Sequence, residues 1–312
     1  MRDQYAGDIS DLLKLSFLRG LATDDRTIGV GWYYNPAHDG RPDGRHREYC
    51  DEPKWESLDA AVWNALKKLP EQSVAALEKL TIWPPDTCFH RAPMASRGNR
   101  QAWSDDMRRK LEDASIIFLD PDNGVGGATE RHATFAEVAA MRRPGRAVVL
   151  IKFPDHQQKH ARQLEEHHNN LRDRAGAVSV VTVCTRVWLQ QPRSRWFTIV
   201  DGDDALIARA RHFAGVLNRI EKCSAEVVSG PLGAGRSDDE VSVGNPSTPE
   251  RARLQAAMKD QSGTTGNVCP ECGHQFKGSG FDGIDAHWRA KHEAIMPYRE
   301  AWPLLKAGIY RR

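Results

Sequence analysis

SIIFLDPDNGV, residues 115–125, joins an unbroken apolar run to a cluster of turn-forming residues. The run from Ile116 to Leu119 predicts a strand that is buried on both faces, as strands of a parallel sheet are. Pro121 and Gly124 then end the strand and turn the chain. We therefore expect Asp120 at the carboxyl end of a central strand, which is where open α/β sheets bind their ligands.

The turn after this strand is rich in hydrogen-bond acceptors, because Asp122 and Asn123 closely follow Asp120. Asp and Asn often bond their own backbone in turns, so a purely structural turn is one interpretation. A functional site is the other, and we favour it because sites gather at this edge of a sheet. The prediction is a catalytic cluster made of Asp120, Pro121, Asp122 and Asn123.

Outward from this strand, predicted strands and helices alternate along the chain. Further strands are predicted at 27–35, 87–94, 147–153, 179–189 and 195–200, and the last two form a hairpin. Helices are predicted at 5–22, 57–69, 71–80, 101–114, 134–142, 157–174 and 205–220. This order predicts an α/β fold with a doubly wound, mostly parallel sheet and an antiparallel terminal hairpin.

A long polar loop is predicted at 37–53, directly after the strand at 27–35. Long loops in compact domains are usually functional or disordered. This loop carries side chains that bind protons, metals or anions, namely His38, Asp39, His46, Arg47 and Glu48.

Composition and charge exclude several classes of protein. The formal net charge is +2 over 312 residues, so the whole molecule does not have the field of a nucleic-acid binder. No apolar run is long enough to cross a bilayer, and residues 1–10 lack the apolar core of a signal peptide. The six cysteines do not form a disulfide framework. We therefore expect a cytoplasmic protein that does not contact membranes.

A change in amino-acid composition along the chain predicts the domain organisation. Residues 224–267 contain the stretches SGPLGAGRSDD, NPSTP and QSGTTGN, which are typical of a linker. One short helix is predicted inside it at 249–259. The prediction is an α/β domain at 1–222, a linker at 223–266 and a small domain at 267–312.

The small domain contains the motif Cys269-x2-Cys272-x14-His287-x4-His292. Two thiolates on a tight turn and two imidazoles one helical turn apart are the ligands of a closed tetrahedral zinc site. Over residues 267–294 the motif resembles the Cys2His2 zinc-finger family, which implies a small ββα fold. Phe276 and Ile284 stand where such a finger keeps its apolar core, and the stretch between them is two residues longer than usual.

The finger is not predicted to read bases. In such fingers the base-reading side chains stand at fixed places before the first zinc histidine, and here these are Gly280, Gly283 and Ala286. None of them makes the bidentate contacts that distinguish bases. Contacts with phosphates would still give affinity without sequence specificity, and the candidates are Arg289, Lys291, Arg299, Arg311 and Arg312. Docking on a protein partner or on the main domain is the open alternative.

Two stretches of the α/β domain resemble a known family. YAGDISDLLK at 5–14 resembles the HAG-N-x-x-D-x-x-K signature that opens the bacterial ribosomal-RNA adenine-N6 methyltransferases. IIFLDPDNG at 116–124 resembles the D-P-P-aromatic motif of amino-group methyltransferases. Over residues 3–200 the chain is also similar to uncharacterised bacterial proteins with GD-x-x-D-x-x-K, WY-x-x-P and FLDPDNG, a likeness that brings no activity.

The resemblance implies a Rossmann-like methyltransferase fold and a transfer of a methyl group from S-adenosylmethionine to an amino group of a base in a nucleic acid. Asp120 would accept a hydrogen bond from that amino group, and Pro121 would fix the turn. Lys14 would lie near the cofactor carboxylate and Tyr5 near the target base. The implied cofactor-binding residues are Tyr5, Asp8, Asp11, Lys14 and Asn35.

The sequence also departs from the family pattern, and two alternatives therefore stay open. Residues 34–36 stand where a glycine-rich loop is expected, DPDN lacks the aromatic, and no clear acidic residue ends a second strand to hold the ribose. One alternative is a Mg²⁺-dependent nuclease or other phosphoryl-transfer enzyme, with Lys14 or Lys152 facing a phosphate. Its metal ligands would be Asp8, Asp11, Asp120 and Asp122. The other is a zinc-finger interaction protein with an inactive α/β domain.

Overall fold

The computed structural model describes residues 1–22, 26–38, 40, 46–94, 97–127, 129–155, 158–188, 192–230, 269, 271–274, 284–298 and 300–301. The chain divides into two compact units, Met1–Arg236 and Ser237–Arg312, and each is described by itself. The predicted division into domains at 222 and 266 stays a prediction. Among the described helices, none combines the length and apolar character needed to cross a membrane.

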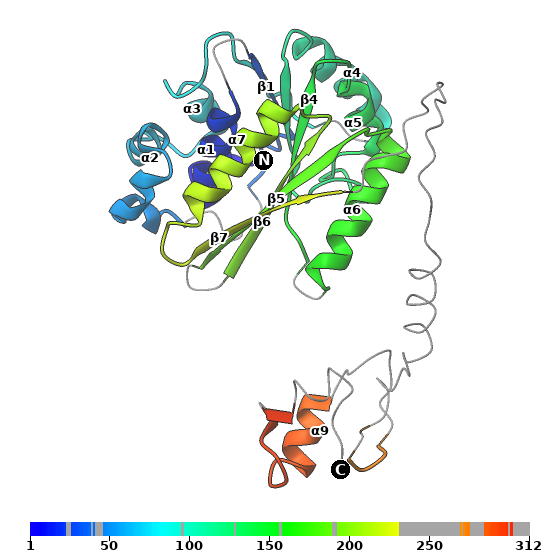
Figure 1. The fold of residues 1–312 in the computed structure, drawn as a ribbon. Coiled ribbons are helices and arrows are strands. Elements are labelled where there is room, and N and C mark those ends of the chain that lie inside the picture. Colours follow the sequence, from blue (N-terminus) through cyan, green and yellow to red (C-terminus); the bar gives the residue numbers. More distant parts are fainter. Residues whose placement is uncertain are drawn as a thin grey trace, which may run out of the picture. The chain divides into compact units, whose positions relative to one another are not determined.

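The first unit contains a seven-stranded sheet whose order is β2-β1-β3-β4-β6-β5-β7 (Figure 1). The strands β1 to β4 run parallel to one another, and β6 runs antiparallel to both β4 and β5. This arrangement confirms the predicted mostly parallel sheet with an antiparallel terminal hairpin. The strands are β1 (Ile28–Trp32), β2 (Cys88–His90), β3 (Ile116–Asp120), β4 (Ala147–Lys152), β5 (Val180–Trp188), β6 (Pro192–Val200) and β7 (Cys223–Ser229).

Helices cover both faces of this sheet, which is what a doubly wound fold requires (Figure 1). One apolar core joins one face to the helices α1 (Ile9–Leu21), α2 (Ala60–Lys67), α3 (Val74–Glu78) and α7 (Asp204–Leu217). A second core joins the other face to α4 (Arg100–Lys110), α5 (Phe135–Met141) and α6 (His160–Ala175). Short 3-10 helices lie at Asp3–Tyr5, Glu48–Asp51, Pro53–Ser57 and Arg97–Asn99.

The central strand β3 is buried along its whole length, as its apolar run predicts. Ile116 and Phe118 belong to one core, and Ile117 and Leu119 belong to the other. The apolar run is continuous because successive side chains of a strand point to opposite faces, and both faces are covered here. In the register of the sheet, Asp120 stands beside Trp32, the last residue of β1. Asp120 therefore lies at the carboxyl edge of the sheet, as expected.

Three segments differ from their predicted structure. Residues 223–229, predicted as the start of a linker, form β7 and pair with β5 at the edge of the sheet. None of the residues of β7 is fully buried, so its apolar and polar residues do not alternate clearly. The sequence of this segment therefore resembles a linker. β6 begins at residue 192 and not at 195, so Arg193 belongs to a strand and not to the hairpin loop. Within the helix predicted at 57–69, only Ala60–Lys67 form α2, and Ser57 ends a 3-10 helix that begins at Pro53.

Two predictions concern residues outside those that the structure describes. The first is the short helix predicted at 249–259. The second is the pair of strands expected in the finger at 267–283, where the structure describes only residues 269 and 271–274. The second unit does contain the predicted helix of the finger, α9 (Ile284–Lys291).

Candidate functional site

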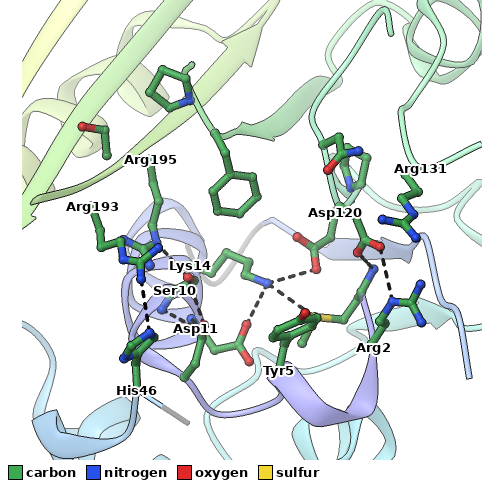
Figure 2. Close-up of a pocket in the computed structure, with 18 residues that line it drawn as sticks. Arg2, Tyr5, Ser10, Asp11, Lys14, His46, Asp120, Arg131, Arg193 and Arg195 are labelled. Carbon is green, nitrogen blue, oxygen red and sulfur yellow. Dashed lines mark hydrogen bonds and ion pairs between the residues drawn. The ribbon is translucent and has the colours of Figure 1, made fainter. Parts of the chain in front are cut away.

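A cavity of about 330 Å³ opens at the carboxyl edge of the sheet (Figure 2). Its size lies at the lower end of the range for small-ligand sites. It brings together residues from the start of the chain, from the turn after β3 and from the start of β6. The predicted site residues that line it are Tyr5, Asp8, Asp11, Lys14, Asp120, Pro121, Asp122 and Asn123.

Lys14 connects α1 to the central strand. Its ammonium nitrogen Nζ lies 2.7 Å from Asp11 Oδ1 and 3.0 Å from Asp120 Oδ2, and all three side chains are buried. Asp8 begins α1 by accepting hydrogen bonds from the backbone amides of Ser10 and Asp11. Because residues three apart on a helix share a face, this start places Asp11 and Lys14 side by side. Figure 2 shows Lys14 reaching from the helix to Asp120.

The two carboxylates keep Lys14 charged. Burial opposes the charge, but Asp11 and Asp120 outweigh it and raise the pKa of Lys14 above its ordinary value. Burial also raises the pKa of Asp11 to about 6, against the opposing effect of Lys14. Burial therefore disfavours the charged form of Asp11 even beside Lys14. Asp120 accepts a hydrogen bond from Lys14 through Oδ2. Its other oxygen, Oδ1, accepts no hydrogen bond from the described residues.

Asp122 is held from the other side of the cavity. Its Oδ1 lies 2.5 Å from the amino nitrogen of Met1, which also donates to the carbonyl oxygen of Tyr33. Arg2 Nε lies 4.0 Å from Asp122 Oδ2. Asp122 therefore neutralises positive charge at the ends of β1 and β3.

Asn35 does not line the cavity, although the resemblance assigns it to the cofactor. Its backbone amide donates to the carbonyl oxygen of Met1 at 2.9 Å, and its side chain accepts from the amide of Ala37 at 2.9 Å. These contacts make Asn35 part of the turn after β1. Its predicted role in binding the cofactor has no support from its position.

The acidic residues do not have the arrangement of a magnesium site. Asp8 caps α1, Asp11 and Asp120 share Lys14, and Asp122 binds an amino group. Within the described part of the chain, no set of carboxylates has the spacing of metal ligands; only the C-terminal Cys and His residues do. Lys152 lines a different cavity. The prediction of Mg²⁺ is therefore not supported.

Several residues of the cavity were missed by the reasoning from sequence. Phe153 follows β4 directly, lines the cavity and is 40% exposed, which is unusual for its size. Its position after the apolar run at 147–152 and before Pro154 was the available signal. Arg193 and Arg195 come from the start of β6, and Arg131 comes from the loop after β3. Their sequence neighbourhoods give no signal, because only the folded sheet brings them to one edge.

The second unit places the predicted zinc ligands together. One ligand atom from each of Cys269, Cys272, His287 and His292 lies within 4.8 Å of every other. Cys272 Sγ is 3.1 Å from His287 Nε2, and the Nε2 atoms of the two histidines are 3.2 Å apart. α9 carries His287, and His292 follows its last residue. Two thiols and two imidazoles that converge on one point fit a tetrahedral Zn²⁺ ion.

Comparison with known proteins gives no function for this arrangement. No protein-family model and no curated protein matches the chain. Among solved structures, the chain is similar to a crystal structure of a Legionella pneumophila Philadelphia 1 protein of the family model DUF519. The likeness covers 72% of this chain and 98% of that chain, with 9% sequence identity and a TM-score of 0.44. A likeness of this size carries no information about ligands.

Proposed function

We propose that the α/β unit transfers a methyl group from S-adenosylmethionine to an exocyclic amino group of a base in a nucleic acid. The observation that carries the proposal is the pairing of Asp120 with an exposed aromatic ring in one cavity. Asp120 ends β3, and Phe153 follows the neighbouring strand β4. An acceptor and a flat apolar surface are what a planar base with an amino group requires.

Asp120 would accept a hydrogen bond from the amino group through Oδ1. Lys14 holds the second oxygen at 3.0 Å, which fixes the orientation of the carboxylate. The carboxylate would aim the nitrogen lone pair at the methyl carbon. The nitrogen–carbon bond would form as the carbon–sulfur bond breaks, S-adenosylhomocysteine would leave, and water would take the proton from the nitrogen. Orienting the reacting groups in this way contributes a large part of the rate acceleration when a reaction has two substrates. Lys14 is a positioning residue in this scheme, because its charge is already matched by two carboxylates.

Phe153 supplies the stacking surface that the DPDN sequence lacks. Base stacking on an aromatic ring contributes about 1–3 kcal/mol per base and tolerates every sequence. The ring is 40% exposed although it is apolar, so covering it with a base would remove apolar surface from water.

S-adenosylmethionine supplies a methyl group on a positively charged sulfur, together with an ammonium and a carboxylate group. The described residues offer charges of both signs for it at the end of β3. Arg131, which is exposed, would hold the carboxylate, and Asp122 would face the positive groups. The resemblance places Lys14 near the cofactor carboxylate, and this placement stays a prediction.

The experiment that tests this function separates binding from turnover. Asp120→Asn is expected to keep the affinity for S-adenosylmethionine within about threefold and to lower methyl transfer to a mixture of RNA and DNA by about 10²-fold or more. Titration calorimetry gives the first quantity, and transfer of a labelled methyl group gives the second. Asp105→Asn, in the exposed part of α4, is the control. Failure of the unaltered protein to bind S-adenosylmethionine would refute the proposal.

For the second unit we propose a bound Zn²⁺ ion with a structural role. Two thiols and two imidazoles leave no open position for a substrate, so the ion would stabilise the fold and not take part in a reaction. Contact with nucleic acid without sequence specificity, or with a protein partner, stays a prediction for this unit, and so does a cytoplasmic location.

A further inference from the structure

The start of β6 forms a basic wall of the cavity. Arg195 is 5% exposed, and its Nε donates a hydrogen bond of 2.7 Å to Ser10 Oγ. Its Nη1 is buried and has no hydrogen-bond partner among the described residues. Arg193 is exposed two residues earlier, with Nη2 3.3 Å from His46 Nε2. Figure 2 shows both arginines on the same side of Lys14.

A buried guanidinium with an unused donor lowers the stability of the fold, because no opposite charge offsets the free energy of its desolvation. Burial lowers the pKa of Arg195, as expected for an arginine without an ion pair. The nearest carboxylates are engaged elsewhere: Asp8 caps α1, and Asp11 binds Lys14 and the backbone amide of Gly7. Neither makes a salt bridge with Arg195. Arg195 therefore lines the cavity with one buried donor, Nη1, that no described residue accepts from.

The position of the wall separates it from Asp120. In the sheet, β4 lies between β3 and β6, so Asp120 and Arg195 are two strand spacings apart, or about 10 Å. Phe153 directly follows β4, the strand between them. An anion at Arg195 is therefore a different group from the one that meets Asp120. Arg195 and Arg193 lead from the buried floor of the cavity to its exposed rim, which fits a chain of charges better than a single carboxylate.

We propose that Arg195 and Arg193 bind backbone phosphates of a single-stranded nucleic acid whose base stacks on Phe153. This inference rests on the proposed function, and it names the part of the substrate that the site holds outside the reacting base. Arginine suits this task because its planar fork donates two parallel hydrogen bonds to a phosphate. A duplex would have to release the base first, whereas a single strand presents it directly.

The test measures binding of a fluorescein-labelled single-stranded RNA of ten nucleotides to the full chain without S-adenosylmethionine. Arg195→Met is expected to weaken binding about tenfold, the loss of one hydrogen bond to a charged group. The slope of log affinity against log salt should fall by about 0.7, the value for one lost phosphate contact on a single strand. Arg193→Met, an exposed and therefore structurally safe change, should reduce the same slope. Arg109→Met, exposed in α4, removes the same charge outside the cavity and is the control.

The outcomes separate this inference from the proposed function. Unchanged RNA affinity in both Arg195→Met and Arg193→Met would overturn the phosphate site. A loss of S-adenosylmethionine affinity with unchanged RNA binding would overturn it too, and would assign the wall to the cofactor carboxylate. If the unaltered protein binds RNA through these arginines but does not bind S-adenosylmethionine, the phosphate site stands and methyl transfer fails. Arg195→Lys, which keeps the charge, should retain most of the salt slope and lose part of the affinity.

Discussion

At the scale of single residues, Lys14 is the side chain on which the candidate site depends. It is buried between Asp11 and Asp120, which come from a helix and from a strand 106 residues later. The three side chains form a network in which one cation serves two carboxylates. Removing the cation would leave two buried negative charges close together, so the site and the stability of the unit are linked through this residue.

Lys14→Met is therefore expected to destabilise the α/β unit by about 3–5 kcal/mol at neutral pH, the usual cost of breaking a buried ion pair. Urea denaturation followed by tryptophan fluorescence measures it. The double variant Lys14→Met/Asp11→Asn should recover part of the loss, because it also removes one of the stranded charges. Strict additivity of Lys14→Met and Asp11→Asn would contradict the network.

At the scale of elements, α6 meets the sheet through a polar network. His167 Nε2 lies 3.0 Å from Thr198 Oγ1, and His168 Nε2 lies 2.8 Å from Thr182 Oγ1. The two threonine hydroxyls are 2.9 Å apart. Burial lowers the pKa of His167 to about 3, with help from Lys152, and burial with Arg172 lowers that of His168 to about 4. Both imidazoles are therefore buried in their neutral form.

This network predicts a loss of stability in mild acid. The folded pKa values lie below the ordinary value of 6.5, so the unfolded chain binds protons first as the pH falls. The stabilising contribution is complete above pH 6.5 and is lost as the pH falls toward 4. Between about pH 6 and 5, each histidine should add nearly 1.4 kcal/mol per pH unit to the slope of the free energy of unfolding against pH. Denaturation at several pH values should show a slope smaller by about that amount in His168→Gln.

The matched control is His212→Gln, because His212 is exposed on α7. It should leave the slope unchanged. Equal slopes in the unaltered protein and His168→Gln would show that His168 does not remain neutral in the folded state.

The packing of α4 on β1 depends on two glycines in the strand. A Cβ atom on Gly29 would lie 2.8 Å from Ala114 Cβ, and one on Gly31 would lie 2.6 Å from Met107 Sδ. The helix can approach this closely only because the strand has no side chains there. Gly29→Ala is expected to destabilise the unit by about 1–3 kcal/mol through overpacking. Gly20→Ala, at a place in α1 with open space, should stabilise it by about 0.5–1 kcal/mol. Thermal denaturation of the two variants, with shifts of opposite sign, checks this.

At the scale of the whole molecule, the two compact units have different sources of stability. The first has two apolar cores around a sheet, whereas the described part of the second has few buried residues and a cluster of metal ligands. A domain without a sufficient core needs a metal ion or another crosslink to fold.

Cys272→Ser is therefore expected to abolish zinc binding and to make residues 267–294 sensitive to proteolysis. The melting transition of the α/β unit should shift by less than about 1 °C, because its cores contain none of these ligands. Elemental analysis and limited proteolysis measure the two effects. Cys223→Ser, in β7, is the control. Zinc-free protein that resists proteolysis equally well would contradict a structural role for the metal.

The sequence by itself determined the parts that depend on local pattern. The apolar run at 116–119 specified a buried strand, and Pro121 with Gly124 specified its end, so Asp120 was placed correctly. The spacing of the two cysteines and two histidines specified the Cys/His cluster, since each pair lies close together in the sequence.

Only the tertiary structure decided which of these local features meet. Three features depend on the order and register of strands. They are the contact between Lys14 and Asp120, the exposed ring of Phe153 at the cavity, and the donor of Arg195 that has no partner within the described ranges. β7 was missed because an edge strand that is only half-buried lacks a clear apolar alternation. Periodicity within a segment reports which face of it is buried, but it holds no information about which distant segment covers that face. That choice follows from packing energy summed over the whole sheet, and it placed the arginines of β6 in the same cavity as the aspartate of β3.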